Sequence, residues 1–322
     1  MTPLQIESIA ALPGQKGSGY AHVDTGIAHV RMPLVILNGA QPGPRLALTA
    51  GLHYGEFIGI EALSDLLWKI TPAALAGQVV ACPLACPPSC VTHRTHASPL
   101  DGVNPNRVYP GSRTGGPTER LVAWVFEHLI RGSDVFIDLH GGGVTLDLSS
   151  FVGFRSSGSP EQDHRAKELA SLFGLPIIRG RSADGGNSHA AATRAGIVSL
   201  LVEVGAQGSR SPDQVAIVRD GVLRVMHHLG MIKEGPAKPI VGEEHWVWAD
   251  EVTAPIEGLW YPEFEVGGAI EAGQVLGRIL DPLGELLAEM VAPHGGRVFY
   301  GERGLSIGCG DVLAAIAARD TP

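Results

Sequence analysis

The pair His53 and Glu56 has the residue types and the spacing to bind a metal ion. Both lie in segment 51–56 (GLHYGE), where a strand-like apolar run gives way to a helical pattern. A separation of three positions puts the two side chains on one face of a helical turn. A neutral imidazole and a carboxylate placed in this way can bind one cation, although a His-x-x-Glu pattern by itself is common by chance.

His140 supplies a candidate third ligand. It follows the apolar run 134–139 (DVFIDL) and precedes three glycines, which leave the imidazole uncrowded and let other backbone approach it. Asp138 lies on the same side of this strand and could orient the ligand. Catalytic zinc is often held by two histidines and one glutamate, with one position left open for water or substrate. We therefore expect one Zn²⁺ per chain, held by His53, Glu56 and His140.

Glu203 is the candidate general base. It ends the apolar run 197–202 (IVSLLV), where a carboxylate needs either a partner or a chemical function. Zinc lowers the pKa of a bound water toward ~7. Glu203 could accept the proton as hydroxide forms, and later deliver it to the leaving amine of an amide. The tetrahedral oxyanion then needs stabilisation by positive charge.

Alternating strands and helices must position these residues, which predicts an α/β catalytic domain over residues 1–235. A turn at 41–44 (QPGP) is expected between the first two strands, and the stretch 85–117, rich in Pro, Gly, His and Arg, reads as one long functional loop. The expected strands are 28–38, 45–51, 78–84, 134–139, 151–154, 175–179 and 197–204, and the expected helices are 58–70, 118–131, 161–173, 188–195 and 212–230.

Residues 236–322 predict a second, small all-β domain that contains an internal repeat. Segment 254–258 (APIEG) recurs at 292–296 (APHGG), and 270–276 (IEAGQVL) recurs at 307–313 (IGCGDVL). This pattern resembles the biotinyl/lipoyl-like barrel-sandwich hybrid, whose carrier members use a lysine on the hairpin between the repeats. Here that hairpin reads DPLGE (281–285), and residues 251–322 contain no lysine. Covalent carrier function is thereby excluded, and we expect this domain to form a wall of the cleft.

Four short motifs follow one another along the chain: His53-x-x-Glu56, Asn106-Arg107, Asp138-Leu139-His140 and Glu203-Val204-Gly205. This order resembles the succinylglutamate desuccinylase/aspartoacylase family over residues 40–320. The resemblance implies a zinc-carboxypeptidase-like mixed sheet flanked by helices, the zinc ligands given above, and Glu203 as general base and acid. It also implies that Asn106 and Arg107 grip a substrate carboxylate and that Arg94 stabilises the oxyanion.

The leading functional hypothesis is a zinc-dependent amidohydrolase that deacylates an N-acyl amino acid or a related small carboxylate. The bond cleaved would be an amide C–N bond other than an ordinary peptide bond. Two alternatives are a metallocarboxypeptidase-like peptide hydrolase and a non-catalytic metal-binding protein on the same fold. The acyl group and the amino acid are left open.

Composition excludes other classes of protein. The chain has 322 residues, of which 44% are apolar and 18% charged, as in a globular protein with a large core. Its net charge of −9, without basic clusters, argues against nucleic acid or an anionic membrane surface as a partner. Neither a signal peptide nor an apolar run long enough to span a bilayer is found.

The cysteines and the remaining histidines carry weaker predictions. The four cysteines read as small buried residues in a reducing compartment, so a cytoplasmic location is expected. His93 and His96 lack further ligands nearby, which favours a hydrogen-bonding role over a second metal site. His189 reads as a polar residue at the start of a helix, although it could line the pocket. A homo-oligomer is left open.

Overall fold

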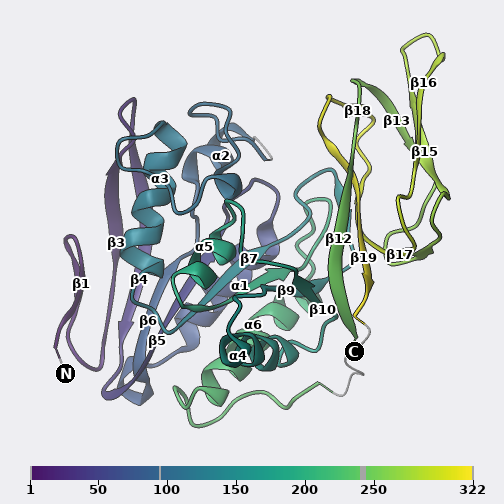
Figure 1. Cartoon of the computed structure of the whole chain (residues 1–322). Coiled ribbons are helices and arrows are strands. Elements are labelled where there is room, and N and C mark those ends of the chain that lie inside the picture. Colours follow the sequence, from purple (N-terminus) through teal and green to yellow (C-terminus); the bar gives the residue numbers. More distant parts are fainter. Residues whose placement is uncertain (1, 94–95, 240–243, 321–322) are drawn as a thin grey trace.

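A long mixed β-sheet runs through the protein (Figure 1), whose computed structural model describes residues 2–93, 96–239 and 244–320. Within these residues a 13-stranded sheet has the order β14-β17-β19-β12-β10-β9-β11-β7-β5-β6-β4-β3, and β8 pairs with β17. Its strands in the first half of the chain are β3 (Gln15–Asp24), β4 (His29–Asn38), β5 (Gln41–Ala50), β6 (Ala76–Cys82), β7 (Val135–His140), β8 (Leu146–Leu148), β9 (Phe151–Arg155), β10 (Ile177–Gly180) and β11 (Val198–Glu203). A separate hairpin joins β1 (Leu4–Ile6) to β2 (Ile9–Ala11).

The three central strands β5, β7 and β11 are parallel. Their carboxyl ends therefore meet at one edge of the sheet, where open α/β sheets place ligands. Glu203 is the register partner of His140, and Ala50 is the partner of Leu139. The sequence-predicted site residues that follow or end these strands are thus brought together by strand pairing.

Helices cover both faces of this sheet, as Figure 1 shows. On one face α1 (Phe57–Lys69), α4 (Pro160–Ser171) and α6 (Pro212–His228) pack on alternate residues of the central strands, such as Ile137 and Leu200. On the other face α3 (Pro117–Val125), its π-helical extension Phe126–Ile130 and α5 (Ser188–Arg194) enclose a second core around Phe136. Because side chains alternate along a strand, Asp138 and His140 share the face of Phe136 and α5.

The C-terminal region consists of two packed sheets, as expected. Strands β12 (His245–Thr253), β19 (Val312–Arg319), β17 (Gly296–Glu302) and β14 (Ala269–Ile270) extend the main sheet, and β16 (Leu286–Val291), β15 (Val275–Leu280), β13 (Gly258–Pro262) and β18 (Ser306–Ile307) form the other. An apolar core that includes Trp260, Leu276 and Leu313 lies between them. The repeat seen in the sequence corresponds to β13–β14–β15 and β17–β18–β19, and the 281–285 hairpin joins β15 to β16.

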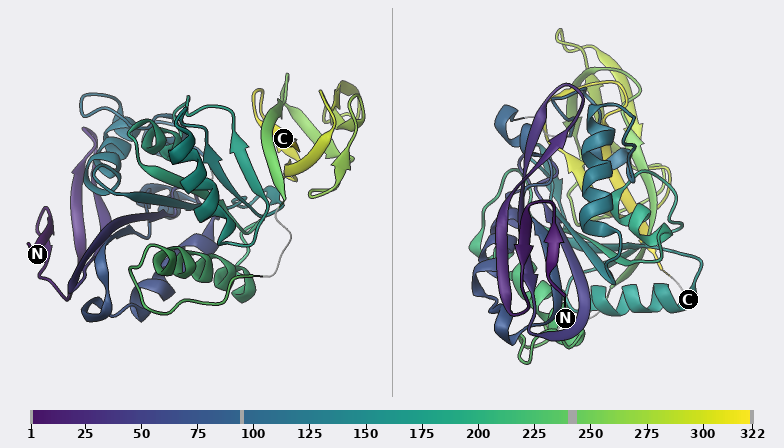
Figure 2. Two further views of the ribbon diagram at one scale, coloured as in Figure 1. Left: turned by 60° about the horizontal axis from the view of Figure 1, so that its bottom comes forward. Right: turned by 90° about the vertical axis from the view of Figure 1, so that its left-hand side faces the viewer.

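The main sheet is continuous between the two regions. Strand β12 pairs in parallel with β10, with Ile178 opposite Trp246. Figure 2 shows the C-terminal strands at the end of the molecule opposite the N-terminal strands. The boundary at 235/236 stays a prediction.

Three local expectations are wrong or incomplete. The turn is at Gly39 and Ala40, and residues 41–44 already belong to β5, because a register irregularity between Gln41 and Arg45 lets the Pro-containing segment pair with β6. The stretch 85–117 contains α2 (Pro87–Thr92) and a 3₁₀ turn at Pro105–Arg107, each begun by proline, which suits a first turn without a bonded N–H. Strands β1 to β3 had no counterpart in the sequence prediction.

The cysteines divide into two kinds. Cys82 and Cys86 are buried, as expected, whereas Cys90 is half-buried and Cys309 is exposed, so burial does not account for all four. Across the described parts of the chain, no helix combines the length and apolarity that crossing a membrane requires.

Candidate metal centre and cleft

The three expected zinc ligands meet at the carboxyl edge of the sheet. His53 follows β5, Glu56 precedes the first turn of α1, and His140 ends β7. All three are buried, and one candidate ligand atom from each lies within 4.8 Å of the others. Glu56 joins the two imidazoles, with Oε1 2.8 Å from Nδ1 of His53 and Oε2 2.9 Å from Nδ1 of His140.

Glycines allow the chain to pack this closely. Gly55 has a φ of +91°, and a Cβ there would lie 2.8 Å from backbone atoms of Gly143 and Val144. Gly141 abuts the backbone oxygens of Val204 and Gly205, 2.8 Å from where its Cβ would be. The glycine run after His140 therefore serves the close backbone approach expected from the sequence.

The other ring nitrogen of each histidine faces an oxygen. Nε2 of His53 lies 3.1 Å from Oδ1 of Asn104, and Nε2 of His140 lies 2.9 Å from Oδ2 of Asp138. Asp138 is itself held by Thr49, whose hydroxyl donates to Oδ1 at 2.6 Å, and by the hydroxyl of Ser188. Acceptors on Nε2 favour the tautomer that presents a bare Nδ1, which is how metal-binding histidines are usually oriented.

The charges of this cluster also suit a cation. Burial by itself would raise the pKa of Glu56, but His53 and His140 lower it to about 2, so the carboxylate is ionised. Burial would lower the pKa of His140, yet Asp138 and Glu56 raise it well above its ordinary value, so without a metal ion the ring holds a proton, which a bound cation would displace. Glu56 Oε2 and His140 Nε2 are buried without a hydrogen bond of good geometry, although each has an ionic contact. This donor set, with its unmet bonding capacity, fits zinc.

Glu203 lies beside this cluster and is buried, with 5% of its surface exposed. Burial raises its pKa to about 8. The charge of His140 lowers this pKa, and the charge of Glu56 raises it. The Tyr300 hydroxyl interacts with the carboxylate, but Oε2 has no hydrogen bond of good geometry with the described residues. A carboxylate of raised basicity next to a metal set is arranged for proton transfer.

The metal cluster and Glu203 open into a cavity of about 800 Å³. This is a volume that accommodates a small-molecule ligand. Its walls come from both halves of the chain, and the C-terminal region contributes Trp248, Glu251, Tyr300, Glu302 and Asp311. The C-terminal region is therefore a cleft wall, as expected.

Asn106 and Arg107 line the same cavity. The backbone oxygen of Asn106 accepts a hydrogen bond from Nη1 of Arg107 at 3.0 Å, and its side-chain Oδ1 accepts from the Ser188 backbone at 2.9 Å. No carboxylate of the described residues forms an ion pair with Arg107. Arg94 lies outside the described residues, so its expected role stays a prediction.

The remaining histidines have different environments. His96 lines the cavity, and its ring centroid is 5.6 Å from that of His53. Burial and the neighbouring His53 lower its pKa. His93 is exposed and stacks on Tyr54, with centroids 4.9 Å apart. His189 begins α5, as expected, but it is also buried and lines the cavity.

Sequence reasoning missed Asn104, Arg155 and Tyr300. Asn104 stands two positions before Asn106 and could have been noticed as part of the same polar motif. Arg155 follows a short apolar strand, and Tyr300 belongs to the distant C-terminal repeat, so neither had a local signal that separated it from a surface residue.

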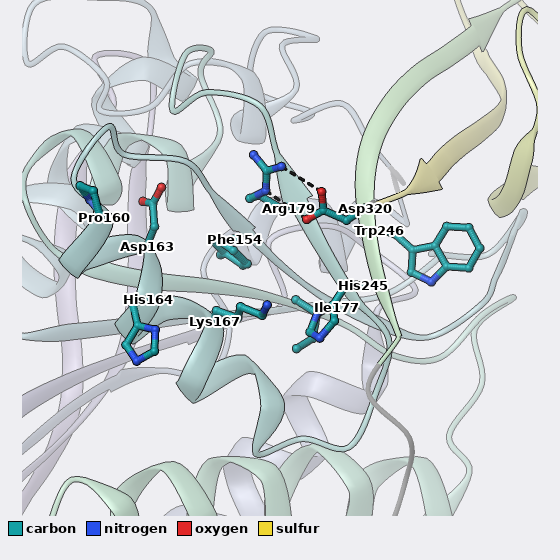
Figure 3. Close-up of a pocket in the computed structure, with 10 residues that line it drawn as sticks. All are labelled: Phe154, Pro160, Asp163, His164, Lys167, Ile177, Arg179, His245, Trp246 and Asp320. Atoms are coloured by element: carbon teal, nitrogen blue, oxygen red, sulfur yellow. Dashed lines mark hydrogen bonds and ion pairs between the residues drawn. The ribbon is translucent and has the colours of Figure 1, made fainter. Parts of the chain in front are cut away.

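A second, smaller cavity of about 230 Å³ lies on the other face of the sheet, against α4 (Figure 3). Arg179 pairs there with Asp320 at 3.1 Å, and Asp163 accepts hydrogen bonds from Ser157. This cavity contains none of the residues expected to do chemistry.

Comparisons with known proteins identify a family model and a curated relative that match this chain. Residues 42–229 match the family model of the succinylglutamate desuccinylase/aspartoacylase catalytic domain. The chain is 30% identical over 298 residues to N-alpha-acetyl-L-2,4-diaminobutyric acid deacetylase of Halomonas elongata, a match that covers 89% of this chain and 86% of the relative.

Two solved structures share the fold over nearly their whole length. One is described as a succinylglutamate desuccinylase/aspartoacylase from Rhodobacter sphaeroides, with a TM-score of 0.83, 26% identity, and coverage of 95% of this chain and 96% of that one. The other is a product-bound structure of the ectoine utilization protein EutE (DoeB) from Ruegeria pomeroyi, with a TM-score of 0.83, 22% identity, and coverage of 98% and 100%.

Proposed function

Because this chain belongs to the succinylglutamate desuccinylase/aspartoacylase family, we propose that it is a zinc-dependent deacylase of an N-acyl amino acid. Its membership supports hydrolysis of an amide bond. We propose zinc dependence and the roles of individual residues from the geometry of the site.

One observation carries the proposal. A buried His₂Glu set and a buried glutamate of raised pKa stand together at the base of one cavity. Three protein ligands with a general base nearby are the arrangement of zinc hydrolases, which need an open coordination position for chemistry.

His53, Glu56 and His140 would hold the zinc ion, and Asn104 and Asp138 would fix the two imidazoles. When bound, zinc supplies a Lewis acid that polarises the amide carbonyl and acidifies water. Glu203 removes the proton from the attacking water and returns it to the leaving nitrogen, so that the amine departs neutral. Tyr300 holds the carboxylate of Glu203 toward the cavity.

The cavity also suggests what the amino-acid part looks like. Asn106 and Arg107 would bind its carboxylate, because a guanidinium matches a carboxylate in shape and charge. The part of the lining that comes from the C-terminal region carries Glu251, Glu302 and Asp311. These carboxylates favour a cationic side chain over an acidic one, and the Halomonas relative acts on a diaminobutyric acid derivative, which bears a second amine.

The deciding experiment combines metal analysis with a substrate panel. Purified protein should contain close to one zinc per chain, and the panel should include N-acetyl, N-formyl and N-succinyl derivatives of diaminobutyrate, aspartate and glutamate, together with unblocked dipeptides. We expect turnover of an N-acyl amino acid and none of dipeptides. Hydrolysis of the dipeptides alone would favour the carboxypeptidase alternative, and a zinc-loaded protein that cleaves nothing would favour a metal-binding role.

Single substitutions test the proposed role of each residue. Glu56→Ala and His140→Ala should lose zinc, whereas Glu203→Gln should keep it and lose at least ~100-fold in kcat. Glu234→Gln, at an exposed position after α6, is the matched control and should leave both quantities unchanged. Retention of zinc by both ligand variants would disprove the ligand assignment.

A further inference from the structure

We propose that Arg155 is a second residue that binds the substrate carboxylate, held in place by Asn187 and His189 and accommodated by Gly180. The inference rests on the proposed deacylase function for the identity of the ligand. Arg155 is the last residue of β9, and its side chain lines the same cavity as Arg107 and the metal cluster.

The guanidinium of Arg155 is fixed along one edge. Its Nε donates to Nε2 of His189 at 3.1 Å, and its Nη2 donates to Oδ1 of Asn187 at 3.2 Å. These two nitrogens form the lateral edge of the planar group. The terminal edge, made of Nη1 and the second hydrogen of Nη2, stays available for the two oxygens of a carboxylate.

His189 is suited to this positioning. It is buried, with 2% of its surface exposed, and burial together with the charge of Arg155 lowers its pKa well below the ordinary value. The ring is therefore neutral near pH 7. Because Nε of Arg155 can only donate, Nε2 of His189 must accept, which assigns the ring proton to Nδ1, a buried atom with no hydrogen-bond partner among the described residues.

Gly180 makes room for the arginine. It is the register partner of Arg155 on the adjacent strand β10. A Cβ at this position would lie 2.5 Å from Cδ of Arg155 and 2.8 Å from Nη1. Only glycine lets the arginine lie across β10 in its observed position.

The two arginines of the cavity belong to one hydrogen-bonded unit. Asn187, which accepts from Arg155, donates through Nδ2 to the backbone oxygen of Asn106 at 3.2 Å. That same oxygen accepts from Arg107. The segment that fixes Arg155 therefore also fixes the Asn106–Arg107 pair, and both arginines line one cavity.

Among the residues that the structure describes, no carboxylate forms an ion pair with Arg155. Arg179 on the neighbouring strand, by contrast, is paired with Asp320. Burial and the like charge of Arg107 lower the pKa of Arg155, and the charge of Glu251 opposes them. An anion that reaches both arginines would relieve this repulsion, and a substrate carboxylate meets that requirement.

The test compares a carboxylate substrate with its carboxamide in the zinc-loaded enzyme. The substrates are N-acetyl-L-2,4-diaminobutyrate and its α-carboxamide. Arg155→Met should raise KM for the acid by about 10- to 100-fold, which is the effect of losing a charge-assisted hydrogen-bonded pair, and should leave KM for the carboxamide within about threefold. Equal effects on both substrates would overturn the proposal.

Gly180→Ala tests position rather than charge. The flexible arginine can move away from a new methyl group, so the fold should be retained and the positive charge kept. We expect the same rise in KM for the acid as in Arg155→Met, with little change in KM for the carboxamide. Arg179→Met is the matched control, because Arg179 pairs with Phe154 on β9 and lines the other cavity (Figure 3). This variant should keep the wild-type preference for the acid over the carboxamide.

His189 is tested by a conservative pair. In His189→Gln an amide oxygen lies close to the position of Nε2, so this variant should keep most of the preference for the acid. His189→Leu should lose that preference, and the loss should appear as a higher KM for the acid rather than a lower kcat. Identical behaviour of the two variants would remove the positioning role of His189.

A binding measurement separates this inference from the proposed function. Calorimetric titration of the zinc-loaded protein with L-2,4-diaminobutyrate and with its α-carboxamide needs no turnover. Preference for the acid in the wild type, lost in Arg155→Met, would support the carboxylate site even if no N-acyl substrate were cleaved. Equal binding of both compounds by wild type and variant would overturn the inference. The substrate panel would still decide separately whether the protein is a deacylase.

Discussion

Replacement of Glu203 by glutamine should change how the stability of the metal-free protein depends on pH. Burial raises the pKa of this carboxyl from an ordinary value of 4.5 to about 8 in the folded state. In the unfolded chain the carboxyl titrates at its ordinary value. The folded protein therefore binds more protons between these values, and the stability of the wild type falls as pH rises from 4.5 toward 8.

The magnitude follows from the two pKa values. Each pH unit between them corresponds to ~1.4 kcal/mol, so the folded state loses ~2 kcal/mol by about pH 6 and ~5 kcal/mol above about pH 8. Glutamine does not titrate. Relative to the wild type, Glu203→Gln should therefore gain ~3 kcal/mol in the free energy of unfolding between about pH 6 and pH 9.

The assay is denaturant unfolding of chelator-treated protein at several pH values, followed by tryptophan fluorescence. Glu251→Gln removes an exposed carboxylate from the lining of the cavity and serves as the control. Added zinc should reduce the difference between wild type and Glu203→Gln, because a nearby dication favours the ionised carboxylate. If the free energies of unfolding of wild type and Glu203→Gln changed in parallel from pH 6 to pH 9, Glu203 would not be a buried group that binds a proton in the folded state.

Three further predictions concern the residues around the metal set. Asp138→Asn should weaken zinc affinity by about 10- to 100-fold in competition with a chelator, because Asp138 lies 2.9 Å from Nε2 of His140; unchanged affinity would show that it does not orient the ligand. Gly55→Ala should lower the midpoint of thermal unfolding and the zinc content together, since its φ is +91° and the new methyl would meet the backbone of Gly143; a normally loaded variant would contradict this. Tyr300→Phe should move the acidic limb of the kcat/KM profile to higher pH, because the Tyr300 interaction lowers the pKa of Glu203; a shift to lower pH would contradict the contact.

The central part of the fold and the metal set could be predicted from the sequence because their signals are local. The apolar runs before His140 and at Glu203 define buried strands that end in ionisable residues, and parallel pairing then fixes which ends meet. The pairing of strands β1 to β3 had no such signal, since β3 has an alternating but mostly exposed pattern at the edge of the sheet. Residues 41–44 show the limit of turn propensity, because pairing with β6 extends β5 through two prolines.

The less predictable part of the site depends on contacts that are distant in sequence. Tyr300 reaches Glu203 only because β17 and β19 extend the main sheet, and Asn104 reaches His53 through the 3₁₀ turn that follows it. Asn187 contacts both Arg155 and Asn106. Sequence patterns report periodicity within a segment and carry no information about such pairings, so these residues could be found only from the three-dimensional arrangement.

The position of β10 links these observations. It pairs with β9 on one side and with β12 on the other, so Gly180 lies between the strand that carries Arg155 and the strand that begins the C-terminal wall. A displacement of β12 would therefore move the acidic wall relative to the arginines through one shared strand. On this side of the cavity, the separation between Arg155 on β9 and Glu251 on β12 is set by backbone hydrogen bonds through β10. From such a fixed separation we expect a preference for a short amino acid with charges at both ends, in which the C-terminal region would take part through Glu251.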